Sequence, residues 1–172
     1  MIYRISRAAI LAAELHAGQQ RSGWHPVPYI EHPIRVAERI RLAAKGAVAV
    51  ENLPVELFEA ALLHDVIEEG EDPAIARRDI VDTCGIDVLA LVEGLTDDPR
   101  WPREHRMSEQ ACRVEYGHSP LLAIVKLADK LDNVVSMRES RLPAARAIRY
   151  CDGAAIVGAA CWRRIAIGRA HV

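Results

Sequence analysis

Prolines and glycines divide this 172-residue chain into segments of helical length. Prolines stand at the start of several segments and glycines follow the end of others, which is the asymmetry that helix termini favour. The segments predicted to be helical are Ile2 to Ala17, Pro33 to Lys45, Pro54 to Gly70, Pro73 to Gly85, Ile86 to Leu95, Arg103 to Tyr116, Leu121 to Arg138, and a last long segment from Pro143. No alternating apolar and polar run is long enough to predict a useful strand. The sequence therefore predicts an all-α fold.

The composition agrees with a helical bundle. Hydrophobic residues make up 51% of the chain and aromatic residues only 5%, so the apolar mass is alanine, leucine, valine and isoleucine. This mixture favours helix over strand. Because 172 residues suit one domain, we expect residues 1–172 to form a single compact helical domain.

Charge and cysteine usage argue against several classes of protein. A net charge of −2 argues against a nucleic-acid partner. The cysteines form no C-x-x-C pair, which suits reduced thiols in a cytosol. No apolar run approaches the ~20 residues that cross a membrane, and charges interrupt Ile2 to Leu15, so we expect an amphipathic helix there and not a signal peptide. We predict a cytoplasmic protein without a membrane partner; its oligomeric state is left open.

A cluster of polar residues follows the apolar run Phe58 to Leu63. His64 and Asp65 are adjacent, and Glu68 and Glu69 come one helical turn later. Residues four apart share a helix face, so we expect His64 over Glu68 and Asp65 over Glu69. Unpaired buried charge is costly, and a divalent metal ion is the simplest partner for this cluster.

A second acid stands where a leucine would be expected. In the segment from Leu121, Asp129 comes four residues after Val125 and therefore lies on the core-facing stripe, with Asn133 one turn later. Taken alone, Asp129 fits a core ion pair with a lysine or arginine, and His64 fits a hydrogen-bonded core histidine. The two helices together point to a shared cation.

His32 precedes Pro33 at the start of a helix, where a ring is held at a fixed place. Taken alone it needs no role. Together, His32, His64, Asp65 and Asp129 offer two imidazoles and two carboxylates, a set that suits Mn, Fe, Co or Zn. Glu68 and Glu69 could then orient or deprotonate the attacking water, or protonate the leaving group. The alternative for both is a solvated acidic helix end.

Several stretches in order resemble the HD superfamily of metal-dependent phosphohydrolases. They are most similar to its (p)ppGpp hydrolase branch, which contains the RelA/SpoT hydrolase domain and the metazoan SpoT homologues. The stretches that carry the resemblance are His16 to Arg21, Pro28 to Pro33, Ala60 to Glu69, Leu95 to Asp98 and Val125 to Asn133. The resemblance implies an HD-domain helical bundle that acts on an alarmone of the stringent response.

The resemblance also implies roles for the site residues. His32, His64, Asp65 and Asp129 would bind one Mn²⁺-like ion, and Glu68 and Glu69 would occupy the catalytic acid positions. A further group would contact the nucleotide. This group consists of Arg21 (phosphate or base), Asn133 (ribose or phosphate) and Tyr150 (pocket wall, or alternatively a packing residue).

Two departures from the family pattern concern activity and substrate. The family usually has Glu-Asp where this chain has Glu68 and Glu69, and the extra methylene moves a carboxylate by about an ångström, which can retune the rate. A lysine or arginine often follows the position of Arg21, but here Ser22 follows, so one phosphate contact is expected to be missing.

The resemblance predicts hydrolysis of the 3′-pyrophosphate of (p)ppGpp to GDP or GTP and pyrophosphate. One alternative is another HD nucleotide phosphohydrolase, such as an NADPH 2′-phosphatase, with the loop Ser22 to Pro28, including His25, discriminating the substrates. The other is a metal- or nucleotide-binding module that lost catalysis through the change at Glu69. No synthetase domain follows, so we expect a chain that removes the alarmone and does not make it.

Overall fold

A computed structural model describes residues 1–21, 26–45, 52–137 and 142–170. The fold is all-α, as predicted. The helices are α1 (Ile2–Leu15), α2 (Glu31–Ala44), α3 (Val55–Leu63), α4 (Val66–Glu69), α5 (Pro73–Cys84), α6 (Ile86–Leu95), α7 (Arg103–Tyr116), α8 (Leu121–Ser136) and α9 (Ala144–Ala170). The segment from Pro143, predicted to be helical, forms most of α9, which packs along α7 and α8.

Proline and glycine act at the ends of α5 as the sequence predicts. The side chain of Asp72 accepts hydrogen bonds from the backbone N–H groups of Ala74 and Ile75, with Pro73 in the first turn. Gly85 ends the helix with φ +97°, a conformation that side-chain-bearing residues rarely adopt. The next helix, α6, begins at once, so α5 and α6 pack as neighbours.

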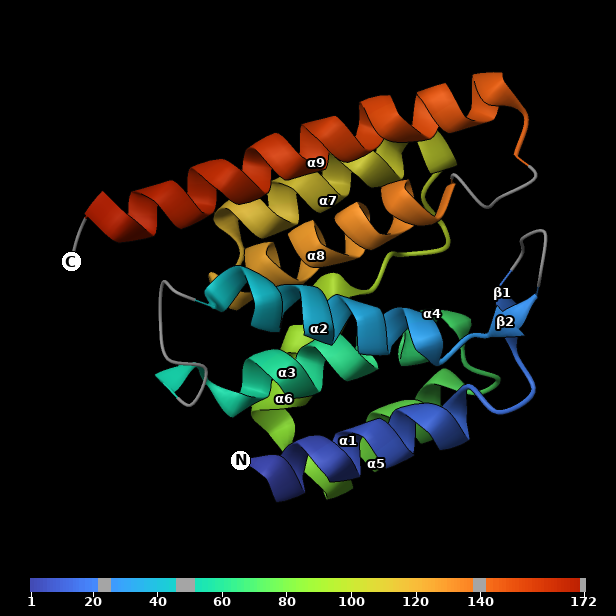
Figure 1. The fold of residues 1–172 in the computed structure, drawn as a ribbon, viewed down its shortest axis with the longest axis vertical. Coiled ribbons are helices and arrows are strands. Elements are labelled where there is room, and N and C mark those ends of the chain that lie inside the picture. The colour runs from blue at the N-terminus through green and yellow to red at the C-terminus, as the bar shows by residue number, and fades with distance from the viewer. Residues whose placement is uncertain (22–25, 46–51, 138–141, 171–172) are drawn as a thin grey trace.

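The helices are arranged around α3 (Figure 1). On one side, α2 and α8 separate α3 from α7 and α9, and on the other side α1 and α5 cover it. Every residue of α3 from Leu57 to Leu63 is buried, as in a helix that is enclosed by its neighbours. Even Glu59 is fully buried, and it binds Arg4 of α1 through two hydrogen bonds of 3.0 and 2.6 Å. The end of α3 therefore delivers His64 to the interior.

Two local features differ from the sequence prediction. The helix expected from Pro54 to Gly70 is interrupted, because His64 and Asp65 form a turn between α3 and α4. A two-stranded antiparallel sheet also forms, in which β1 (Gln20–Arg21) pairs with β2 (Val27–Pro28). The strands are only two residues long, too short for an alternating pattern to reveal them.

The helix ends predicted at Lys45 and at Arg138 fall at the edge of what the structure describes. Helix α2 ends at Ala44 and α8 at Ser136, and Arg138 lies outside the described residues. None of the described helices combines the length and apolar character that a membrane crossing needs.

The apolar core beneath α1 and α5 provides a stability test that does not alter any residue of the polar cluster. Ile80 in α5 is fully buried in a cluster that also contains Leu63 and Val92. Ile80→Ala removes three carbons and leaves a cavity, so we expect the free energy of unfolding to fall by about 2–5 kcal/mol. Urea unfolding followed by circular dichroism measures the loss, and a change below about 1 kcal/mol would contradict this packing.

Candidate metal centre

Three segments that are distant in sequence bring the four predicted metal ligands together. His32 comes from the first turn of α2, His64 and Asp65 from the turn between α3 and α4, and Asp129 from the middle of α8. The helix is interrupted after Leu63, and this turn allows the side chains of the adjacent residues His64 and Asp65 to face each other at the same site. His32, His64 and Asp129 are almost fully buried, and Asp65 is partly exposed.

The facing atoms are nitrogens and carboxylate oxygens. His32 Nε2 lies 3.4 Å from Asp65 Oδ2 and 3.3 Å from Asp129 Oδ1. His64 Nε2 lies 3.2 Å from Asp65 Oδ1 and 3.8 Å from Asp129 Oδ1. Both imidazoles thus point their Nε2 atoms toward both carboxylates.

The Nδ1 atoms of His32 and His64, on the side of each ring away from the carboxylates of Asp65 and Asp129, also have hydrogen-bond partners. His64 Nδ1 lies 2.9 Å from the carbonyl oxygen of Ala61, and His32 Nδ1 lies 2.8 Å from Asp132 Oδ2. A carbonyl or carboxylate oxygen only accepts, so each Nδ1 donates its proton. That arrangement leaves both Nε2 atoms as the metal-facing atoms.

The residues fit a divalent transition metal. One ligand atom each from His32, His64 and Asp65 lie within 4.8 Å of one another. Within the described part of the chain, the buried His64 Nε2 has no hydrogen-bond partner. Buried polar atoms are usually hydrogen-bonded, so this nitrogen is free to bind a metal ion. Two imidazole nitrogens and two carboxylate oxygens suit Mn, Fe, Co or Zn.

Electrostatics hold the carboxylates ionised and the rings protonated in the metal-free protein. Burial alone would lower the pKa of His32, but hydrogen bonds to three aspartates outweigh it and raise the pKa to about 9. For His64 burial is likewise outweighed by the neighbouring carboxylates, and the pKa rises to about 10. Burial would raise the pKa of Asp65, but the two imidazoles bring it well below its usual range.

These shifts predict that metal affinity depends on pH. At pH 7 both rings carry a proton on Nε2, because their pKa values are about 9 and about 10, and that proton must leave before the nitrogen can bind a metal. We expect Mn²⁺ affinity to rise up to about 100-fold per pH unit between pH 7 and 8, since up to two protons are displaced. Calorimetry in buffers of different ionisation enthalpy counts these protons, and a pH-independent affinity would contradict the assignment.

The predicted catalytic acids lie at the solvent side of this cluster. Glu68 and Glu69 are in the short α4, and both residues are exposed. The carboxylate of Glu68 accepts a hydrogen bond of 3.1 Å from the backbone N–H of Asp97. Loss of solvation raises the pKa of Glu68 and of Glu69, and the nearby charge of Asp65 adds to the rise at Glu69. Both groups are thereby moved toward the neutral range in which a general base or acid works best.

The predicted nucleotide contacts also come together. Arg21 in β1 donates hydrogen bonds to Asn133 Oδ1 at 2.5 Å and to Asp132 Oδ2 at 3.2 Å, and Asn133 donates in turn to Asp129 Oδ1 at 2.5 Å. Tyr150 lies in α9, where Lys130 Nζ is 5.7 Å from its ring centroid. Burial, followed by the charge of Asp129, raises the pKa of Tyr150. A chain of polar side chains therefore connects Arg21 to the metal cluster.

Two residues at this site were not singled out from the sequence. The hydroxyl of Tyr29 donates to Asp65 Oδ2 at 2.8 Å, and Asp132 binds His32. Both lie within the stretches that resemble the HD superfamily, but their partners are 36 and 100 residues away in the chain. Asp132 follows Asp129 by one helical turn, and that spacing was the only signal available.

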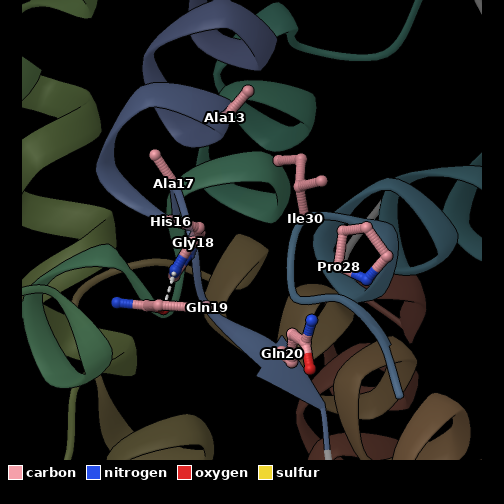
Figure 2. A pocket seen from close by; sticks show the side chains of 8 residues that line it. All are labelled: Ala13, His16, Ala17, Gly18, Gln19, Gln20, Pro28 and Ile30. Atoms are coloured by element: carbon pink, nitrogen blue, oxygen red, sulfur yellow. Dashed lines mark hydrogen bonds between the residues drawn. The ribbon is translucent and has the colours of Figure 1, made fainter.

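A shallow pocket of about 260 Å³ opens beside the cluster, between the end of α1 and the loop before α2 (Figure 2). His16 lines it, and Figure 2 shows its ring bound to Gln19, with His16 Nδ1 2.8 Å from Gln19 Oε1. The His16 ring also stacks on Tyr29 with a centroid distance of 4.6 Å. Tyr29 thus links a ring that lines the pocket to Asp65, because its hydroxyl donates to Asp65. Ser22 and His25, expected to affect substrate choice, lie outside the described residues.

Comparison with known proteins identifies relatives for most of the chain. Residues 8–150 match the HD domain family. The Danio rerio guanosine-3′,5′-bis(diphosphate) 3′-pyrophosphohydrolase MESH1 is 39% identical over 127 residues, which are 72% of this chain and 63% of that protein. The Homo sapiens MESH1 is 36% identical over 131 residues, 76% of this chain and 68% of that protein. The chain therefore spans about two thirds of the length of these relatives.

The fold comparison agrees. A solved structure of a metazoan orthologue of SpoT that hydrolyses ppGpp superposes with a TM-score of 0.78 at 27% identity, covering 92% of this chain and 85% of that one. The Escherichia coli bifunctional (p)ppGpp synthase/hydrolase SpoT is 32% identical over 81% of this chain, which is 19% of its own length. The chain belongs to the HD domain family and, within it, groups with the metazoan SpoT homologues.

Proposed function

We propose that this protein is a metal-dependent hydrolase of (p)ppGpp that releases pyrophosphate from the ribose 3′ position and leaves GDP or GTP. The observation that carries the proposal is the buried cluster of two histidines and two aspartates, in an HD-family chain whose relatives are named for this reaction. A small nucleotide substrate agrees with the relatives' names, and a cytoplasmic location is part of the same proposal.

Membership of the HD hydrolases indicates a divalent metal ion, and we propose Mn²⁺, held by His32, His64, Asp65 and Asp129. The ion supplies Lewis-acid chemistry, since it neutralises phosphate charge and makes water more acidic. The protein contributes two buried histidines whose Nδ1 atoms already donate hydrogen bonds, together with the carboxylates of Asp65 and Asp129.

Glu68 is the proposed general base. Its carboxylate is fixed at Oε2 by the Asp97 backbone N–H, and it lies on the open side of the cluster where a nucleotide can approach. It takes a proton from the water whose oxygen attacks the phosphorus next to the ribose 3′ oxygen. The bond between that phosphorus and the 3′ oxygen breaks, and the 3′ oxygen accepts a proton. Glu69, the next residue in α4, is the proposed donor of that proton.

Arg21, Asn133 and Tyr150 are proposed to bind the nucleotide. The Arg21 guanidinium can form forked hydrogen bonds to a phosphate or stack on a base, and it already lies beside Asn133. Tyr150 bounds the same region from α9. Because Asn133 also binds Asp129, nucleotide contacts and the metal cluster share one hydrogen-bond network.

A product assay tests the proposal. The purified protein with Mn²⁺ is incubated with ppGpp and, separately, with NADPH, and pyrophosphate and orthophosphate are both quantified. We expect pyrophosphate and GDP from ppGpp and no orthophosphate from NADPH. Orthophosphate from NADPH with ppGpp untouched would assign the site to a 2′-phosphatase, and binding of metal and ppGpp without turnover would identify a binding module.

A further inference from the structure

Asp132 is a fully buried carboxylate that is surrounded by cationic side chains. Its Oδ2 atom accepts from His32 Nδ1 at 2.8 Å and from Arg21 at 3.2 Å. Its Oδ1 atom accepts from Arg35 Nε at 3.1 Å and from Arg39 Nε at 3.0 Å. Arg35 also donates to Oδ2, through Nε and an outer guanidinium nitrogen, both at 3.3 Å. Oδ2 therefore contacts the metal ligand His32, the substrate contact Arg21 and Arg35, whereas Oδ1 contacts Arg35 and Arg39.

The arginines fix the orientation of this carboxylate. Arg35 and Arg39 are one turn apart on α2, and they hold Asp132 of α8 against the helix that carries His32 in its first turn. Forked guanidinium–carboxylate hydrogen bonds are directional, so they restrict rotation of the Asp132 side chain. Its Oδ2 atom is thereby kept within hydrogen-bond distance, 2.8 Å, of His32 Nδ1.

A histidine can bind a metal through either ring nitrogen, and the hydrogen bond of the other nitrogen decides which one. A carboxylate paired with three guanidiniums accepts and does not donate. His32 must therefore carry its proton on Nδ1 when it binds an ion, and its Nε2 atom is left to face Asp65 and Asp129 at 3.4 and 3.3 Å.

We propose that Asp132 is a positioning residue: it fixes the His32 ring for metal binding through Nε2, and it sets Arg21 beside the same site. The proposal deepens the proposed function and rests on its metal site. The same oxygen of Asp132 contacts both a predicted metal ligand and a predicted substrate contact, so one substitution should affect both.

Mn²⁺ calorimetry on the metal-stripped protein tests the inference with three variants. Asp132→Asn keeps the shape of the side chain but turns one oxygen into an N–H donor. Arg39→Gln removes a partner of Oδ1 and leaves the His32 contact intact. Glu59→Gln is the matched control, because Glu59 is a fully buried carboxylate bound by an arginine, and it joins α3 to α1.

We expect Asp132→Asn to weaken Mn²⁺ binding by about 10- to 100-fold, as for other residues that orient a metal-bound histidine. Glu59→Gln should lower the melting temperature and leave Mn²⁺ affinity unchanged, and Arg39→Gln should change the affinity by less than about threefold. Equal affinity in Asp132→Asn and the wild type would overturn the proposal. So would an equal loss in Arg39→Gln, because the ion cluster as a whole would then be responsible.

A spectroscopic measurement on the wild-type protein tests the same inference without requiring that Asp132→Asn folds. It identifies which ring nitrogen of His32 carries the proton. In ¹⁵N NMR of the Zn²⁺-loaded wild-type protein, His32 should show a slowly exchanging proton on Nδ1 and a metal-bound Nε2. A proton on Nε2 would overturn the proposal. Neither measurement involves turnover. Absence of ppGpp hydrolysis would therefore refute the proposed function and leave the role of Asp132 in metal binding intact. An unchanged Mn²⁺ affinity in Asp132→Asn would refute the role of Asp132 and leave the proposed function intact.

Discussion

Asp65→Ala is expected to abolish Mn²⁺ binding at the cluster and to reduce ppGpp turnover by about a thousandfold or more. Asp65 faces both histidines through different oxygens, Oδ2 toward His32 and Oδ1 toward His64. Its removal leaves the two imidazoles with one carboxylate in place of two and takes away one of two anionic ligands. A metal ion contributes several kcal/mol to phosphoryl transfer, which corresponds to this loss in rate.

Calorimetry and a pyrophosphate-release assay measure the two effects on the same sample. Asp129→Ala should behave in the same way, because its Oδ1 atom also lies near both rings. Ile80→Ala is the control for destabilisation, since it should lower the unfolding free energy and leave Mn²⁺ binding in place. Wild-type turnover in Asp65→Ala would show that the metal site lies elsewhere.

Glu68→Gln is expected to lower kcat by about 10²- to 10⁴-fold while Mn²⁺ binding is retained. The amide keeps the size of the side chain and can still accept from the Asp97 N–H, but it cannot take a proton. The raised pKa of Glu68, which follows from its loss of solvation, places the wild-type group closer to neutrality than an ordinary glutamate. Activity should therefore fall as pH decreases through that pKa, because the protonated acid is no longer a base.

Steady-state kinetics separate this role from substrate binding. A fall in kcat with an unchanged KM agrees with proton transfer, whereas a rise in KM alone would assign Glu68 to binding. Glu69 offers a comparison within the same short helix. Glu69→Asp restores the Glu-Asp pair that the HD family usually carries, and we expect the rate to increase if the extra methylene displaces the carboxylate.

The helical architecture could be predicted from the sequence because its signals are local. Proline and glycine positions gave α6 and α7 with the bounds that the structure shows, and Asp72 caps α5 through contacts two and three residues away. The break at His64 and Asp65 has no such signal, because neither residue is a helix breaker. Both side chains instead make contacts distant in sequence: Asp65 with His32 and Tyr29, and His64 with Asp129.

The candidate site was only partly predictable for a similar reason. His32, Asp65 and Asp129 stood out as polar groups on apolar stripes or at a helix start, and the structure places them together. Asp132 and Tyr29 did not stand out, because their importance depends on partners 36 to 111 residues distant. The packing of α2 against α8 brings Asp132 and His32 together. The periodicity of the sequence does not specify which helices pack against each other.

Titration of the metal-stripped protein with Mn²⁺, followed by pyrophosphate release from ppGpp, tests the central claim most directly. We expect no release without metal and a rise that saturates at one equivalent of tightly bound ion, in parallel with the binding isotherm. Asp65→Ala should show neither binding nor release. Full pyrophosphate release in the presence of a chelator, or equal release from wild type and Asp65→Ala, would contradict a metal-dependent hydrolase centred on His32, His64, Asp65 and Asp129.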